Sequence, residues 1–85
     1  MDYLSVHREN GPAMARDPNN VILGNRIREL RLKAGMSQEA LAEAANLHRN
    51  MIGLLERGQR SASLQTMVKV AKALKVRPKQ LLWKF

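Results

Sequence analysis

Apolar residues recur at helical spacing from residue 21 to the end of the chain, whereas residues 1–20 show no sustained period. The leading segment contains Gly11, Pro12 and the turn-forming run DPNN, which predicts an N-terminal arm over residues 1–20. Residues 21–85 carry successive apolar stripes without the alternation typical of strands. The pattern therefore predicts an all-α, five-helix domain preceded by a flexible arm.

The predicted helices are bounded by residues that favour helix ends. Gly35 is suited to end the first helix, and the hydroxyls of Ser37 and Ser63 are suited to cap the second and fourth. Asn46 tolerates the left-handed backbone of a tight turn, and Pro78 suits the first turn of a short fifth helix. The residues expected to face inward are Ile22, Leu23, Ile27, Leu30, Ala34, Ala40, Leu41, Ala44, Ala45, Leu64, Met67, Val68, Ala71, Leu74 and Leu81.

The third predicted helix, from about His48 to Arg57, has an unusual outer face. Met51, Ile52 and Leu55 share its inner face, whereas the opposite face carries Arg49, Asn50, Gly53 and Leu54. The second and third helices are joined by only a few residues, which is typical of a helix-turn-helix, whose second helix lies in the DNA major groove.

The outer-face residues suit that groove. Arg49 can donate two hydrogen bonds to guanine, Asn50 can pair with adenine, and Leu54 can pack on a thymine methyl. Gly53 would let the helix backbone approach the DNA closely. The alternative is that Leu54 packs on a partner helix and Gly53 marks fraying.

The charge is unevenly distributed. The chain has a formal net charge of +8; residues 1–56 hold seven acidic and seven basic side chains, whereas residues 57–85 hold eight basic ones and no acid. A basic surface indicates a polyanionic partner such as nucleic acid. The alternative is a surface charge that serves solubility alone.

The spaced run GMSQEALA…NL…I…LERG…SL…M…VAKAL resembles the Cro/phage-repressor helix-turn-helix family, XRE-like small bacterial or phage regulators, over about Leu23 to Leu82. The resemblance implies a lambda-repressor-like DNA-binding domain. It also implies a partly buried ion pair between Arg31 and Glu56. The residues that it implies as phosphate contacts are Gln38, His48, Arg57, Gln59 and Arg60.

The sequence departs from the family pattern at three positions. Asn46 stands where relatives usually have Gly, His48 where Ser or Thr usually caps the third helix, and Ala62 where Pro is common. These changes leave the DNA-binding interpretation in place but predict a weaker or different cap at His48 and a looser loop before Ser63.

Enzymatic function finds no support in the sequence. The chain has no Cys, its two His are far apart, and Glu39 and Glu43 are expected on a solvated helix face. No metal, cofactor or small-molecule effector is expected. No apolar run approaches the roughly 18 residues needed to cross a bilayer, so no membrane contact and a cytoplasmic location are expected. The expected function is a repressor or restriction–modification controller; the alternative is an antitoxin that binds its operator and a toxin protein.

A homodimer is expected, because one short helix offers few base contacts. Two copies related by a two-fold axis would bind a palindromic operator. Trp83 and Phe85, near the chain end, are expected at the dimer interface, where aromatic residues are enriched. In the alternative arrangement, Trp83 folds back over the fourth helix and covers the core of the monomer.

Overall fold

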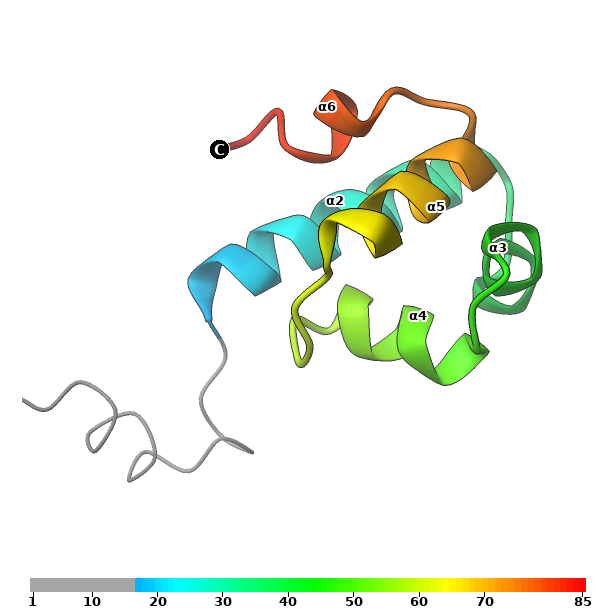
Figure 1. Ribbon diagram of the computed structural model, residues 1–85, viewed down its shortest axis with the longest axis horizontal. Helices are drawn as coiled ribbons and strands as arrows, with labels where there is room; N and C mark the ends of the chain where they lie inside the picture. The colour runs from blue at the N-terminus through cyan, green and yellow to red at the C-terminus, as the bar shows by residue number, and fades with distance from the viewer. Residues whose placement is uncertain (1–16) are drawn as a thin grey trace, which may run out of the picture.

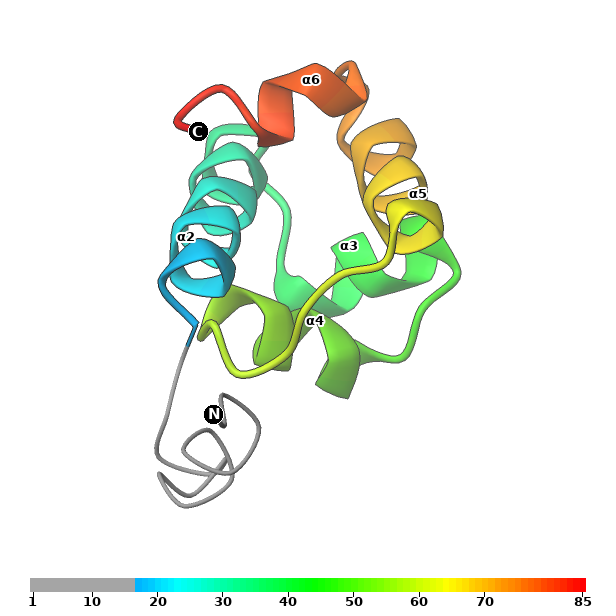
Figure 2. The same cartoon turned by 60° about the vertical axis from the view of Figure 1, so that its left-hand side comes forward.

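The computed structural model describes residues 17–85, in which all regular structure is α-helical. The helices are α2 (Pro18–Lys33), α3 (Gln38–Ala45), α4 (Arg49–Glu56), α5 (Leu64–Leu74) and α6 (Pro78–Leu81). Figures 1 and 2 both show α6 on the side of the bundle opposite α4. The all-α, five-helix prediction is confirmed; the flexibility expected for residues 1–16 lies outside the described residues.

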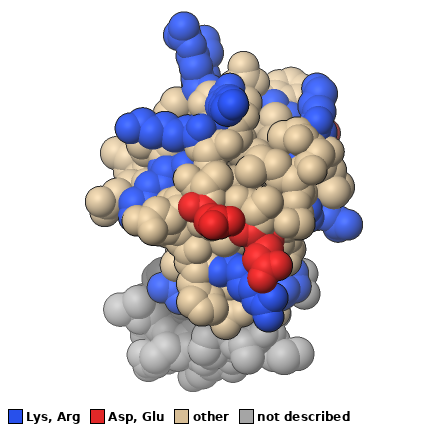
Figure 3. Space-filling view, turned by 90° about the vertical axis from the view of Figure 1, so that its right-hand side faces the viewer, with Lys and Arg blue, Asp and Glu red and all other residues tan. Residues whose placement is uncertain are grey.

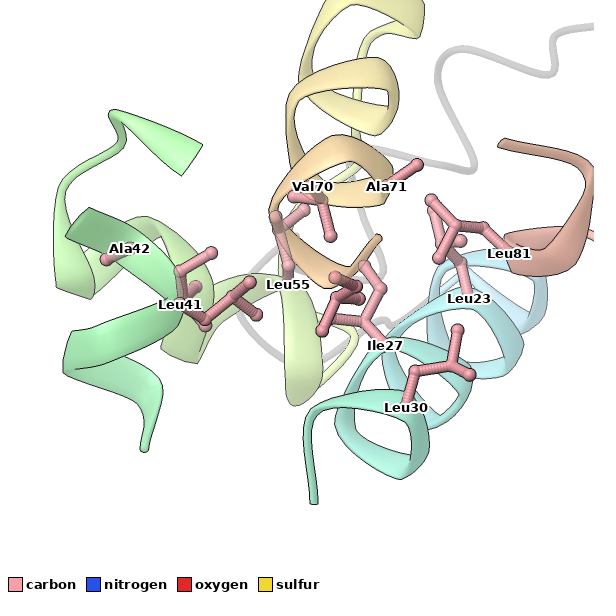
Figure 4. Packing of buried hydrophobic residues seen from close by; sticks show 11 residues of the cluster. Leu23, Ile27, Leu30, Leu41, Ala42, Leu55, Val70, Ala71 and Leu81 are labelled. Atoms are coloured by element: carbon pink, nitrogen blue, oxygen red, sulfur yellow. The ribbon is translucent and has the colours of Figure 1, made fainter. Parts of the chain in front are cut away.

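The core draws residues from every one of these helices (Figure 4). Ile27, Leu41, Ile52, Val70 and Leu81 have no exposed surface. The other buried apolar residues of this cluster are Leu23, Leu30, Ala42, Leu55, Ala71 and Leu74. Three of the residues expected to face inward lie at the surface instead, Ala34, Ala44 and Leu64.

Helix α2 begins before the predicted boundary. The arm was expected to extend to residue 20, but Pro18 is already helical. Asp17 caps the helix, its carboxylate accepting a hydrogen bond from the backbone N–H of Asn19 at 2.8 Å. The run DPNN therefore starts a helix here instead of forming a turn, because an Asp cap followed by Pro at the first helical position favours a helix N-terminus.

The connection between α3 and α4 is a tight turn over residues 46–48. Asn46 has φ 58° and ψ 47°, the left-handed conformation expected from its identity. The backbone N–H of Leu47 then donates to the carbonyl of Ala42 at 2.8 Å, and Leu47 packs against the core. The predicted helix-turn-helix is thus present, and buried side chains of α3 and α4 pack in the same core.

Gly24 brings α2 directly against the end of α4. Gly24 is buried, and a Cβ atom there would overlap the carbonyl oxygen of Leu55 and lie 2.9 Å from that of Glu56. Both obstacles are backbone atoms, so they cannot move aside as a flexible side chain would. The absence of a side chain at residue 24 therefore sets how closely α2 can approach α4.

Candidate nucleic-acid interface

Helix α4 has one face in the core and one face open. Ile52 and Leu55 are buried in the core, whereas Arg49 and Asn50 are exposed and Leu54 is half-buried. The open face borders a hollow whose other side is the start of α3. The lining residues are Ser37, Gln38, Glu39, Arg49, Asn50, Gly53, Leu54 and Arg57. The structure thus brings the four residues expected to read bases to one surface.

His48 supplies the cap at the start of α4. Its Nδ1 accepts a hydrogen bond from the backbone N–H of Asn50 at 3.1 Å. A neutral imidazole that accepts a hydrogen bond at Nδ1 carries its proton on Nε2. The ring of His48 is exposed, so its Nε2–H group can donate to a ligand. The unusual residue therefore performs the capping function of Ser or Thr and keeps an N–H available for a ligand.

Glu56, at the other end of α4, lies in a buried polar cluster. Its carboxylate accepts hydrogen bonds from Arg31 Nε at 2.6 Å and Arg31 Nη2 at 3.1 Å. Arg31 Nη1 donates to the carbonyl oxygen of Met36 at 2.8 Å, and Gln38 Nε2 donates to Glu56 at 2.9 Å. This cluster joins α2, α3 and α4, so it orients the open face of α4 without being part of it.

Gln38 has capacity for a second contact. It is half-buried at the start of α3, and its bond to Glu56 uses one of the two amide hydrogens. The remaining hydrogen is available to a ligand at the rim of the hollow. Gln38 can therefore brace α4 and meet a phosphate at the same time.

Arg49 is paired only loosely. Its Nη1 lies 3.4 Å from a carboxylate oxygen of Glu39, and the two side chains are 65% and 74% exposed. Exposed pairs of this kind contribute little to stability. Arg49 is therefore free to exchange Glu39 for another acceptor.

The space over Gly53 is not empty, contrary to what the sequence suggested. Gly53 is buried, and the nearest atoms to a Cβ built there all belong to the Arg57 guanidinium, with Nη1 at 3.0 Å. Arg57 Nε donates to Gln59 Oε1 at 2.8 Å. The guanidinium of Arg57 thus lies over Gly53 on the open face of α4, and both Arg57 and Arg60, in the following loop, are exposed. The alternative that Gly53 marks fraying is wrong, since α4 continues to Glu56.

The C-terminal aromatic residues lie away from this face. Trp83 and Phe85 are 60% and 56% exposed, so Trp83 does not cover the core as one alternative held. The Trp83 ring lies beneath the Arg26 guanidinium, with 5.3 Å from Cζ to the ring centre. Arg26 Nε also donates to the carbonyl oxygen of Gln80 at 2.8 Å. Sequence reasoning missed Arg26, which ties α2 to the chain end.

The basic residues after Glu56 do not form one surface. Lys69 and Lys72 are on α5 and Lys79 is on α6, and α6 lies opposite α4 (Figures 1 and 2). Figure 3 shows basic side chains in separate groups on one face, with acidic side chains between them. The charge of residues 57–85 as a whole therefore does not mark one surface, whereas Arg49 and Arg57 both line the hollow at α4.

Neither a metal-binding cluster nor a membrane-spanning helix is found in the part of the chain that the structure describes. Residues 17–85 contain no group of three or more His, Asp or Glu residues placed to hold a metal ion. Over the same range, no helix combines the length and apolar character required to cross a membrane. His7 lies outside the described residues.

A family model and several known proteins match most of the chain. Residues 27–81 match the family model described as helix-turn-helix. Control protein C.BamHI of Bacillus amyloliquefaciens is 48% identical over 67 residues, covering 75% of this chain and 83% of that protein. Control protein C.SmaI of Serratia marcescens is 43% identical, covering 72% and 73%.

A solved structure of a related protein agrees with the fold. The restriction-modification controller protein C.AhdI from Aeromonas hydrophila is 45% identical, with a TM-score of 0.75. The match covers 76% of this chain and 98% of C.AhdI. The likeness therefore extends over nearly the whole of that protein.

Proposed function

The chain belongs to the helix-turn-helix family, and from this premise we propose that it is a sequence-specific regulator of transcription that binds double-stranded DNA. Its similarity to control proteins supports the narrower proposal of a repressor or restriction–modification controller. The observation that carries the proposal is the open face of α4, where Arg49, Asn50 and Leu54 border one hollow. These are side chains that suit guanine, adenine and the thymine methyl group.

Phosphate contacts are proposed around that face. The candidates lie at the start of α3, at the start of α4 and in the loop after α4: Gln38, His48, Gln59 and Arg60. Gln38 and His48 each keep an N–H available after their internal hydrogen bonds, and Arg60 is exposed. Phosphate contacts fix the position of a protein on the duplex, whereas base contacts select the sequence.

The relatives favour a regulator over an antitoxin. They include control proteins and HTH-type transcriptional regulators, and the proposed function needs no toxin partner, cofactor or small-molecule effector. The proposal implies action in the cytoplasm, the compartment that holds bacterial DNA. A stoichiometric protein partner recovered with the purified chain would reverse this preference.

The direct test is selection of bound sites from random duplex DNA. We expect a palindromic site to be enriched, and we expect binding to weaken steeply as salt rises, because phosphate contacts release counterions. No bound duplex at low salt, or a flat response to salt, would contradict the proposed function.

The working form is proposed to be a homodimer. One α4 helix supplies few base contacts, and two copies would place their α4 helices about 34–36 Å apart on successive major grooves. Near the chain end, the exposed apolar side chains are Leu82, Trp83 and Phe85, 43%, 60% and 56% exposed. An apolar surface with aromatic residues supports an interface at this end.

The interface can be tested by paired variants. Trp83→Ala combined with Phe85→Ala should lower the mass from dimer to monomer at micromolar concentration and weaken binding to the palindrome. Leu64→Ala removes an apolar side chain that is more exposed than either aromatic, 72% exposed, at the start of α5, and should leave the dimer intact. A dimer that persists in the Trp83/Phe85 variant but is lost in Leu64→Ala would place the interface on α5.

A further inference from the structure

The side chain of Arg57 has a position that a simple phosphate contact does not require. Arg57 follows the last residue of α4, and its backbone N–H donates to the carbonyl of Gly53 at 3.1 Å. Side chains at a helix lean toward its N-terminus, so the guanidinium lies back over the preceding turn. There it lines the same hollow as Arg49, Asn50 and Leu54.

Gly53 provides the seat for this guanidinium. All three of the nearest atoms to a Cβ at residue 53 are guanidinium atoms of Arg57, with Nη1 at 3.0 Å and Cζ at 3.7 Å. A methyl group would push the guanidinium off the helix, because the end of an arginine side chain moves more easily than a backbone. A glycine in the middle of a helix is unfavourable, and the close approach of Arg57 gives a reason for it here.

Gln59 fixes the direction of the guanidinium. Arg57 Nε donates to Gln59 Oε1 at 2.8 Å, whereas Nη1 and Nη2 donate to no acceptor within residues 17–85. The fork of N–H groups is thus held in one orientation and left open toward the hollow. Holding a side chain in its binding orientation reduces the entropy lost on binding.

Resting on the proposed function, we propose that Arg57 determines sequence specificity, with its guanidinium reading a guanine edge in the major groove. An arginine fork pairs with guanine O6 and N7. Arg57 and Arg49 then read different base pairs, Gly53 and Gln59 position Arg57, and Arg60 contacts phosphate. This proposal differs from the phosphate contact that the family resemblance implies for Arg57.

The test compares variants in selection of bound sites from random duplex DNA, with salt dependence measured on the best site. Arg57→Lys keeps the charge but loses the fork. We expect it to reduce the preference for guanine at one base pair by about 5- to 100-fold, while the salt slope stays unchanged. Gly53→Ala should reduce the preference for guanine at the same base pair. Because Ala favours a helix more than Gly does, the thermal melt of this variant should show an intact fold.

Arg60→Ala is the matched control. It should weaken all sequences similarly, keep every base preference and make the log–log salt slope shallower by about one unit. The same result for Arg57→Ala, together with a full set of preferences in Arg57→Lys, would overturn the proposal and return Arg57 to the phosphates. If the unaltered protein selects no sequence, the proposed function itself is wrong, and that outcome is distinct from the first.

Discussion

An arginine–glutamate pair stands at each end of α4, and the two pairs are built in opposite ways. Arg31 and Glu56 meet at 2.6 Å with side chains only 9% and 3% exposed, and Gln38 and the carbonyl oxygen of Met36 satisfy further groups. Arg49 and Glu39 meet at 3.4 Å through one contact, with both side chains mostly exposed. The same two residue types thus form a fixed junction at one end and a loose pair at the other.

The difference indicates that the two ends of α4 have different roles, one in the fold and one in binding. A buried pair is costly to break, because the remaining charge stays buried without a partner, whereas an exposed pair opens at little cost. The C-terminal end of α4 is therefore anchored to α2 and α3. Its N-terminal end presents an arginine that can leave its partner for DNA. Four predictions test this contrast.

The largest effect is expected at the buried pair. Glu56→Gln leaves the Arg31 charge uncompensated and should lower the free energy of unfolding by about 3–5 kcal/mol. In a domain of this size that corresponds to a fall in Tm of more than about 12 °C, measurable in thermal melts. The matched control, Glu43→Gln on the exposed part of α3, should change Tm little. An unchanged Tm would show that the buried pair does not stabilise the fold, and tighter DNA binding would show that the carboxylate opposes binding.

A smaller effect, on binding instead of stability, is expected at the exposed pair. Arg49→Ala should cost about 1–3 kcal/mol on the best DNA site and relax preference at one base pair. Tm should stay nearly constant, because Arg49 is 65% exposed. Titration of the best site and of random DNA gives the two affinities. Equal losses on both would mean that α4 does not read the sequence.

The carboxylate of the exposed pair should act against binding. Glu39→Gln removes a negative charge beside the hollow, and we expect affinity for all duplexes to rise by a few-fold, within about 1 kcal/mol. Glu43→Gln again serves as the control. Weaker binding of Glu39→Gln, with loss of a base preference, would show instead that Glu39 holds Arg49 in its reading position.

The smallest effect concerns a third pair, Arg26 and Glu29, joined at 3.0 Å. The hydrogen bond from Arg26, aided by the charge of Lys84, lowers the pKa of the Glu29 carboxyl. A lowered pKa stabilises the fold above the ordinary pKa of glutamate, about 4.3, and this contribution is lost as pH falls through the lower value. Thermal melts between about pH 3 and 6 should show a slightly shallower acid decline for Glu29→Gln. If Tm depends on pH in the same way in Glu29→Gln and in the unaltered protein, the Arg26–Glu29 pair does not contribute to stability.

Much of the fold could be predicted from the sequence, because it depends on neighbours along the chain. Ser37 and Ser63 cap their helices through backbone N–H groups three residues later. Asn46 adopts the left-handed turn for reasons internal to its own side chain. The period of apolar residues identified all five helices, although it placed Ala34, Ala44 and Leu64 inside and left Val70 out. Such errors arise because one periodic stripe fits several rotations of a helix.

The candidate reading residues were also visible in the sequence, since Arg49, Asn50 and Leu54 share a face by helical spacing alone. The sequence did not reveal where the guanidinium of Arg57 lies, nor that it covers Gly53. That depends on a rotamer and on Gln59 beyond the end of the helix. Spacing assigns a face but does not fix the direction of a long side chain.

What the sequence by itself determined is local: the helices, their caps, the turn and the composition of the open face of α4. Only the tertiary structure decided the contacts between distant segments, such as Gly24 against Leu55 or Arg26 on Gln80, 54 residues away. It also spread the eight basic residues of 57–85 over α5, α6 and the segments around them, on different sides of the bundle. The reason is physical: hydrogen bonds at helix ends join near neighbours in the chain, whereas packing joins whichever surfaces the folded helices bring together.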